Sequence, residues 1–152
     1  MINNFMDFFV FTIRLSVLIM NKMKHICNDC GKCCQKTEML LSERDIRLIE
    51  EKILNITRDE FTQLNEKGIY QLKNKDNHCV FLDIKSKLCN IYKIRPQGCR
   101  FYPIIYDNEK KVCIYDEECP RVSQFYLSHK KFKKICNNIK KFIKRDLKIE
   151  IT

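Results

Sequence analysis

Four cysteines fall within eight residues of this chain, in the run CNDCGKCC from Cys27 to Cys34, and no other feature limits its structure so strongly. A C-x-x-C step turns the backbone so that two thiolates can reach one metal ion, and Gly31 permits a positive φ within the loop. We expect the adjacent Cys33 and Cys34 to point in different directions and so to serve two different ions. Four thiols this close together are not ordinary core cysteines, so the run predicts metal binding.

Ten cysteines in 152 residues leave two explanations, bound metal or disulfides. The apolar segment 5–20 is short for a transmembrane helix and contains Asp7 and Arg14. It also lacks the basic start and the small-residue cleavage site of a secretory signal. We therefore expect a cytoplasmic protein without a clear transmembrane segment. Thiols stay reduced in that compartment, which favours metal over a disulfide-framed exported fold.

A second group, Cys79, Cys89 and Cys99, is spaced at intervals of ten residues. Arg95 and Arg100 lie beside it and can stabilise the negative charge of metal-bound thiolates from a second shell. The alternative is that these arginines cap helix ends. The neighbouring aromatic and aliphatic residues can line a dry site, but they are more often simple core residues; they are Ile91, Tyr92, Phe101 and Tyr102.

The rest of the chain predicts an α+β fold. Ser42 with Asp45 forms a capping-box pattern that starts a helix, and Thr57 with Glu60 repeats it for a second helix that ends near Gly68. Strands are expected at 69–73 and 79–84, and a hairpin at 104–106 and 112–115. Apolar residues at helical spacing then predict a long amphipathic helix over 120–147.

The net charge of +10 is concentrated in that last segment: residues 1–119 contribute +2 and residues 120–152 contribute +8. This basic helix could meet nucleic acid, anionic lipid or an acidic partner, or it could be a solvated face. We divide the chain into an apolar N-terminal extension (1–23), a cysteine-cluster domain (24–127) and the basic helix (120–147). The extension is a membrane-leaning helix, a packed helix or a mis-assigned start.

Linked motifs identify a family resemblance: CxxCGxCC from Cys27, CxFLD from Cys79, CxIYxxRPxxCRxYP from Cys89, and a later Cys119-Pro. Over roughly residues 25–127 the chain closely resembles the CxxCxxCC family of zinc- or iron-chelating proteins. The resemblance implies a small cysteine-clustered metal-binding domain with eight shared metal ligands. By position these are Cys27, Cys30, Cys33, Cys34, Cys79, Cys89, Cys99 and Cys119.

Two cysteines fall outside this pattern. Cys136 lies beside Ile135 on the expected helix and is read as a packing residue, whereas Cys113 could replace Cys119 as a ligand. His25 and His78 each neighbour a cysteine and could ligate, although a solitary surface histidine is the commoner case.

The cofactor is an iron–sulfur cluster or Zn2+, because four cysteines serve both. The tight C-x-x-C-x-x-C run resembles iron–sulfur proteins, without the C-P of ferredoxins, and it slightly favours iron. Ligand softness argues against calcium and magnesium.

A role in metal handling or electron transfer, with a redox or protein partner, is the first functional hypothesis, and folding is then coupled to metal binding. The family pattern also occurs in longer lysine N-methylases, but no binding motif for S-adenosylmethionine is visible. A zinc-stapled nucleic-acid-binding module that uses the lysine face of 120–147 is the third hypothesis.

Overall fold

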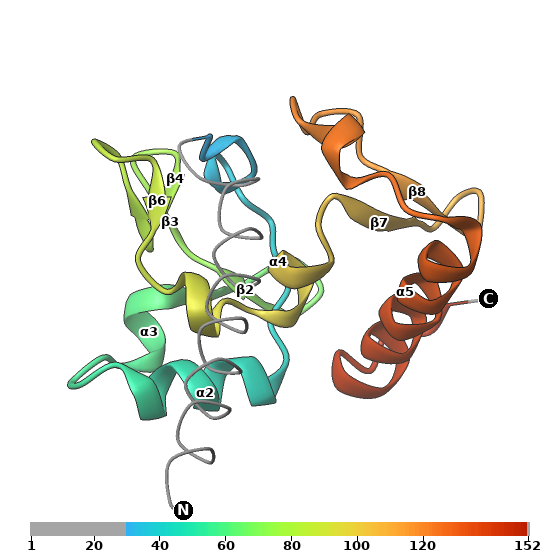
Figure 1. Cartoon of the computed structure of the whole chain (residues 1–152). Coiled ribbons are helices and arrows are strands. Elements are labelled where there is room, and N and C mark those ends of the chain that lie inside the picture. Colours follow the sequence, from blue (N-terminus) through green and yellow to red (C-terminus); the bar gives the residue numbers. More distant parts are fainter. Residues whose placement is uncertain (1–29, 152) are drawn as a thin grey trace, which may run out of the picture.

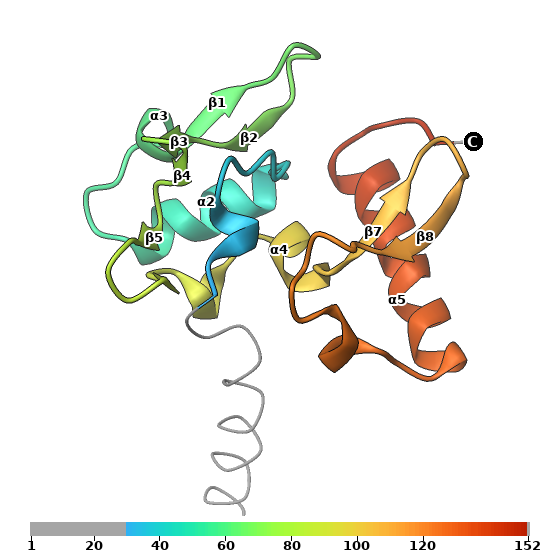
Figure 2. The same cartoon turned by 90° about the horizontal axis from the view of Figure 1, so that it is seen from above.

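The computed structural model describes residues 30–151 and divides them into two lobes that lie side by side (Figures 1 and 2). Helices α2 and α3 and the small hairpins β1–β6 form the first lobe, and β7, β8 and α5 form the second. Helix α4 (Gln97–Phe101) stands between them. Helices combined with short antiparallel hairpins agree with the α+β prediction.

The first lobe begins with the 3-10 turn η1 (Lys32–Cys34), followed by α2 (Glu43–Lys52) and α3 (Arg58–Phe61). Its strands form three antiparallel hairpins: β1 (Thr62–Leu64) with β2 (Tyr70–Leu72), β3 (Asn74–Lys75) with β4 (His78–Cys79), and β5 (Leu82–Asp83) with β6 (Leu88–Cys89). The turn η2 (Tyr92–Ile94) and α4 lead to the second lobe. There β7 (Ile104–Asp107) pairs with β8 (Val112–Tyr115). The chain then forms η3 (Val122–Phe125), α5 (His129–Lys141) and the π-helical turn η4 (Phe142–Asp146).

The capping box at Ser42 also connects the two lobes. The Ser42 amide and hydroxyl both donate to Asp45 Oδ2, at 3.0 and 2.6 Å, and the Asp45 amide donates to Ser42 Oγ at 3.2 Å. The second carboxylate oxygen, Asp45 Oδ1, accepts the Gln97 amide at 2.8 Å. One buried carboxylate therefore starts α2 and fixes the first residue of α4, the helix that carries Cys99.

Replacing Asp45 is expected to destabilise the protein. Asp45→Ala removes the cap, worth about 1 kcal/mol, and leaves the Gln97 amide without a charged acceptor, worth about 1.5–3 kcal/mol. Asp45→Asn keeps one acceptor oxygen and so can preserve only one of the two contacts, and its cost should lie between the wild type and Asp45→Ala. Urea unfolding of the two variants measures this difference. An Asp45→Ala variant within 0.5 kcal/mol of the wild type, about the scatter of surface substitutions, would show that this carboxylate is not the link.

The helix expected from Thr57 is much shorter than predicted. Its capping box with Glu60 is present, but α3 ends at Phe61 and the next residues pair as β1 with β2. Gly68, with φ +71°, lies in the loop of that hairpin and does not end a helix. The Asn65 side chain closes this loop by accepting the amides of Lys67 and Ile69. The strand pairing thus overrides the helical pattern.

Each lobe has its own apolar core. In the first lobe Ile46, Ile49 and Phe61 are fully buried, and the Phe61 ring packs on Phe81 at 5.7 Å between centroids. The second core is smaller and centres on Ile104, Cys113 and Ile139. The N-terminal extension predicted for 1–23 lies outside the described residues.

The C-terminal helix differs from the prediction at its beginning. Residues 122–125 form a 3-10 turn and α5 starts only at His129, whereas one helix was expected from 120. Contacts with β8 hold the intervening residues extended, because the Leu127 amide donates to Tyr115 Oη at 2.9 Å and the Tyr126 ring packs on Tyr115. From residue 30 to 151, no helix is long and apolar enough to cross a bilayer.

Candidate metal centre

Seven cysteines line a single cavity of about 1020 Å3 at the junction of the two lobes. Six come from the first lobe and α4, and one comes from the segment after β8. They are Cys30, Cys33, Cys34, Cys79, Cys89, Cys99 and Cys119, and all seven are free thiols. Cys27, the eighth predicted ligand, lies outside the described residues.

The β3–β4 hairpin packs against the cysteine run and holds it in place. Gly31 adopts the predicted positive φ of +61° and begins η1, which presents Cys33 and Cys34. Behind this turn the Lys36 amide donates to the Asn77 carbonyl at 2.8 Å. The Asn74 side chain bonds both the amide and the carbonyl of Thr37, at 3.1 and 2.8 Å. The loop is therefore docked on the β3–β4 hairpin.

The remaining thiols are supplied by different short elements. Cys79 belongs to β4 and Cys89 to β6, where it pairs with Leu82, while Cys99 lies within α4. Cys119 follows a turn in which its amide donates to the Asp116 carbonyl. Cys79 and Cys119 are buried, whereas Cys33 is exposed at the cavity surface.

The side chains around this cavity that most commonly bind metal ions are all cysteines. Within the described residues, no aspartate, glutamate or histidine lines it. Sulfur ligands without oxygen ligands suit zinc or iron–sulfur clusters and not calcium or magnesium. Seven cationic side chains also line the cavity: Lys32, Lys52, Lys87, Lys93, Arg95, Arg100 and Arg121. Because four thiolates around a zinc ion or a cluster leave a negative site, this cationic lining complements a metal–thiolate centre.

Burial and mutual repulsion hold the thiols in their neutral form. The pKa of Cys79 is raised to about 11, chiefly by burial and to a smaller extent by the neighbouring Cys89 and Cys33. The pKa of Cys99 is also raised, first by burial and then by Cys33, Cys79 and Cys89. A pKa raised by three other cysteines indicates that these thiols lie within electrostatic range of one another. Because thiolates are the form that binds metal, metal entry must displace their protons.

Cys33 and Cys34 do not diverge as predicted. Their thiols are hydrogen-bonded to each other, and this bond is the largest cause of a raised pKa at Cys33. The 3-10 turn therefore directs adjacent side chains toward one site. Across residues 30–151, however, no three cysteine, histidine or acidic side chains are arranged closely enough to hold a metal ion. The thiols surround one cavity without forming a finished set of ligands.

The two arginines predicted as a second shell have different roles. Arg95 lowers the pKa of Cys33, Cys89 and Cys99, although burial outweighs it in each case. Its guanidinium carbon lies 3.9 Å from the centre of the Tyr92 ring, and its Nη1 donates to the Tyr92 carbonyl at 2.9 Å. Arg100 donates to the carbonyls of Arg95 and Lys93, so it braces the turn that carries Arg95.

Cys113 and Cys136 form a disulfide with a Cα–Cα distance of 5.7 Å. The prediction that Cys136 is only a packing residue was therefore wrong, and Cys113 is not available to replace Cys119. The bond joins β8 to α5 within the second core. Two cysteines 23 residues apart on different elements gave no sequence signal for this pairing.

Other polar residues lie where the sequence had not placed them. His78 pairs in the β3–β4 hairpin, with Nδ1 2.6 Å from the Asp76 carbonyl oxygen, and His25 lies outside the described residues. Arg121, Lys32 and Lys87 line the cavity but were not predicted. All three lie within two residues of a cysteine ligand candidate, which was the available signal.

Residues 26–120 match the model of a family, CxxCxxCC, described as "Putative zinc- or iron-chelating domain". The chain belongs to the CxxCxxCC family. The match spans all eight predicted ligands and also Cys113, whereas its disulfide partner Cys136 lies outside the matched residues. The family description agrees with the predicted cofactor, zinc or iron, and leaves the metal undecided.

A relative from Methanocaldococcus jannaschii, described as an uncharacterized protein, is 33% identical over 103 residues. The matched residues cover 64% of this chain and 55% of the relative. The chain therefore spans about half the length of this relative. No solved structure is similar to the chain.

Proposed function

We propose that this protein holds a cysteine-ligated metal centre in the cavity between its lobes and works in metal handling or electron transfer. The observation that carries the proposal is the convergence of seven free thiols on one cavity, which no described aspartate, glutamate or histidine lines. The ligands would be these seven cysteines together with Cys27. Such a centre supplies either a structural and storage site for zinc or, as an iron–sulfur cluster, a one-electron carrier.

The cationic lining supports an anionic centre. Arg95 is fixed by its contacts with Tyr92 and favours the thiolate form of three cysteines. Arg100 holds the backbone of that turn through two carbonyl groups. Because these cations are positioned before any metal arrives, they would reduce the cost of gathering thiolates in one cavity.

The apolar part of the lining supports a protected site. Phe81 and Ile91 are buried, and Ile104 contributes from the second lobe. Such walls keep water from most of the cavity, whereas Cys33 reaches the surface. A protein partner could therefore approach the centre at Cys33, which suits electron transfer or metal delivery.

The matched test replaces cysteines inside and outside the cavity. Cys99→Ser should lower the metal content of protein purified without oxygen by at least half. The control, Cys113→Ser with Cys136→Ser, should keep the wild-type content because both residues lie in the second core. Full metal content in the Cys99 variant, or equal loss in the control, would overturn the proposal.

A second measurement uses the wild-type protein, so its result does not depend on whether the Cys99→Ser variant folds. Alkylation followed by peptide mass spectrometry should modify Cys79 and Cys99 slowly in the protein as purified and quickly after chelation without heating. Equal modification rates before and after verified metal removal would also overturn the proposal.

A further inference from the structure

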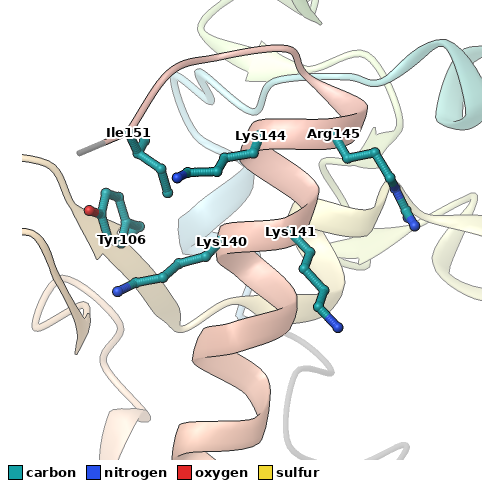
Figure 3. A pocket seen from close by; sticks show the side chains of 6 residues that line it. All are labelled: Tyr106, Lys140, Lys141, Lys144, Arg145 and Ile151. Atoms are coloured by element: carbon teal, nitrogen blue, oxygen red, sulfur yellow. The ribbon is translucent and has the colours of Figure 1, made fainter.

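A second hollow, of about 500 Å3, lies at the C-terminal end of α5 and shares no lining residue with the cysteine cavity. Its floor includes Tyr106 from β7 and Ile151, which is buried beside it. Four cationic side chains from two successive helical turns complete the lining: Lys140, Lys141, Lys144 and Arg145 (Figure 3).

The helix changes its geometry at this point. The α-helix ends at Lys141 and continues as the π-helical turn η4, closed by the Leu147 amide bonding the Phe142 carbonyl at 3.0 Å. Lys140 and Lys144 extend on the side of Tyr106, while Lys141 extends on the other side of the helix (Figure 3). Single π-helical turns occur frequently at functional sites.

Three of the four cations lack a carboxylate partner. Arg145 is paired with Asp146 through two contacts, at 2.8 and 3.2 Å. The Lys140 ammonium lies 5.5 Å from the centre of the Tyr106 ring. In the described part of the chain, no acidic side chain forms an ion pair with Lys140, Lys141 or Lys144. Lys140 and Lys144 therefore place two positive charges without a carboxylate partner on the Tyr106 side of the hollow.

The helix dipole accounts for only part of this arrangement. Cations near a helix C-terminus gain about 0.3–1 kcal/mol each, which favours lysines at this position. The dipole does not require an aromatic ring and a buried isoleucine beside them. A concave site of this size with an apolar floor and convergent charges has the features of a small-molecule pocket.

We propose that this hollow binds a small phosphate-bearing ligand with two or more negative charges, of the nucleoside diphosphate class. The phosphate oxygens lie between the ammonium groups of Lys140 and Lys144, and Lys141 adds longer-range attraction. Tyr106 and Ile151 contact the uncharged part of the ligand. The site is distinct from the metal centre and does not depend on which metal is bound.

The test is calorimetric titration of the full-length protein, with its metal, by ADP and by inorganic pyrophosphate. Lys140→Gln with Lys144→Gln should weaken ADP binding about tenfold or more, since each charge-assisted hydrogen bond contributes about 1.5–3 kcal/mol. The control is Lys130→Gln with Lys134→Gln, which makes the same charge change at the same spacing on exposed residues of the same helix. It should change ADP binding by no more than about twofold, because these exposed charges do not line the hollow and are screened by salt.

Comparing ADP with pyrophosphate shows whether the hollow binds the whole nucleotide or its phosphate groups alone. Tighter binding of ADP than of pyrophosphate supports the pocket and the contact with Tyr106, and equal binding supports a site for phosphate alone. Absence of binding of either probe at millimolar concentration would overturn the proposal. Equal weakening by the two variant pairs, or binding of an oligothymidylate strand without ADP binding, would indicate a helix-wide cationic surface and would also overturn it.

Discussion

Removal of the bound metal with a chelator is expected to lower the thermal unfolding midpoint by about 20 °C or more, or to abolish cooperative unfolding. Structural zinc sites contribute about 10–16 kcal/mol to folding, and 1 kcal/mol shifts the midpoint of a chain of this size by about 2–4 °C. The effect should be large here because the thiols that line the cavity come from five separate segments, which the metal would join. Calorimetry before and after chelation measures it.

The control for chelation is restoration. Adding back zinc, or iron with sulfide, to the chelated protein should recover the original midpoint. The variant that lacks Cys113 and Cys136 should lose as much stability on chelation as the wild type, because its cavity is unchanged. A midpoint that stays the same after verified metal removal would contradict coupled folding and metal binding.

Loss of the Cys113–Cys136 disulfide is expected to cost about 3 kcal/mol. The bond closes a 23-residue segment, and the loss of loop entropy in the unfolded chain for a loop of this length gives about that value. The variant Cys113→Ser with Cys136→Ser should accordingly unfold about 6–12 °C lower than the wild type. Its unfolding should no longer respond to a reductant.

Thiol counting tests the disulfide independently. Two of the described cysteines are disulfide-bonded and seven are free, so with Cys27 expected to be free as well, eight thiols should react in denatured, metal-free protein that has not been reduced. All ten should react after reduction. Ten reactive thiols without a reductant would contradict the disulfide and would remove the predicted difference between wild type and variant.

Local sequence signals predicted local structure correctly. Ser42 with Asp45 and Thr57 with Glu60 are three residues apart, so their capping boxes depend on little else. Gly31 likewise has the positive φ that its place in the cysteine run requires. The prediction failed where distant strands compete: β2 pairs with the residues that were expected to continue α3.

Contacts between residues distant in the sequence also explain why the start of the C-terminal helix and the disulfide were not predicted. Apolar spacing cannot locate the start of α5, because a contact between Leu127 and Tyr115, 12 residues earlier, holds the preceding residues extended. The Cys113–Cys136 bond depends on α5 packing against β8, which no local pattern encodes.

The thiols that share the cavity could be named from the sequence, whereas their surroundings could not. The linked cysteine motifs indicated which thiols to consider, and the seven that are described share one cavity. Arg95 was predicted beside them, whereas Arg121 and Lys87 come from separate loops and meet there only in the folded chain. Which cations gather at a site is a property of the tertiary fold.

The most direct test of the metal centre is elemental and acid-labile sulfide analysis, with a visible absorption spectrum, of the full-length protein purified without oxygen. The proposed centre predicts near-stoichiometric iron with sulfide and visible absorption, or near-stoichiometric zinc in a colourless protein. Protein that contains neither iron nor zinc, yet is folded with its cavity thiols reduced, would contradict a cysteine-ligated metal centre.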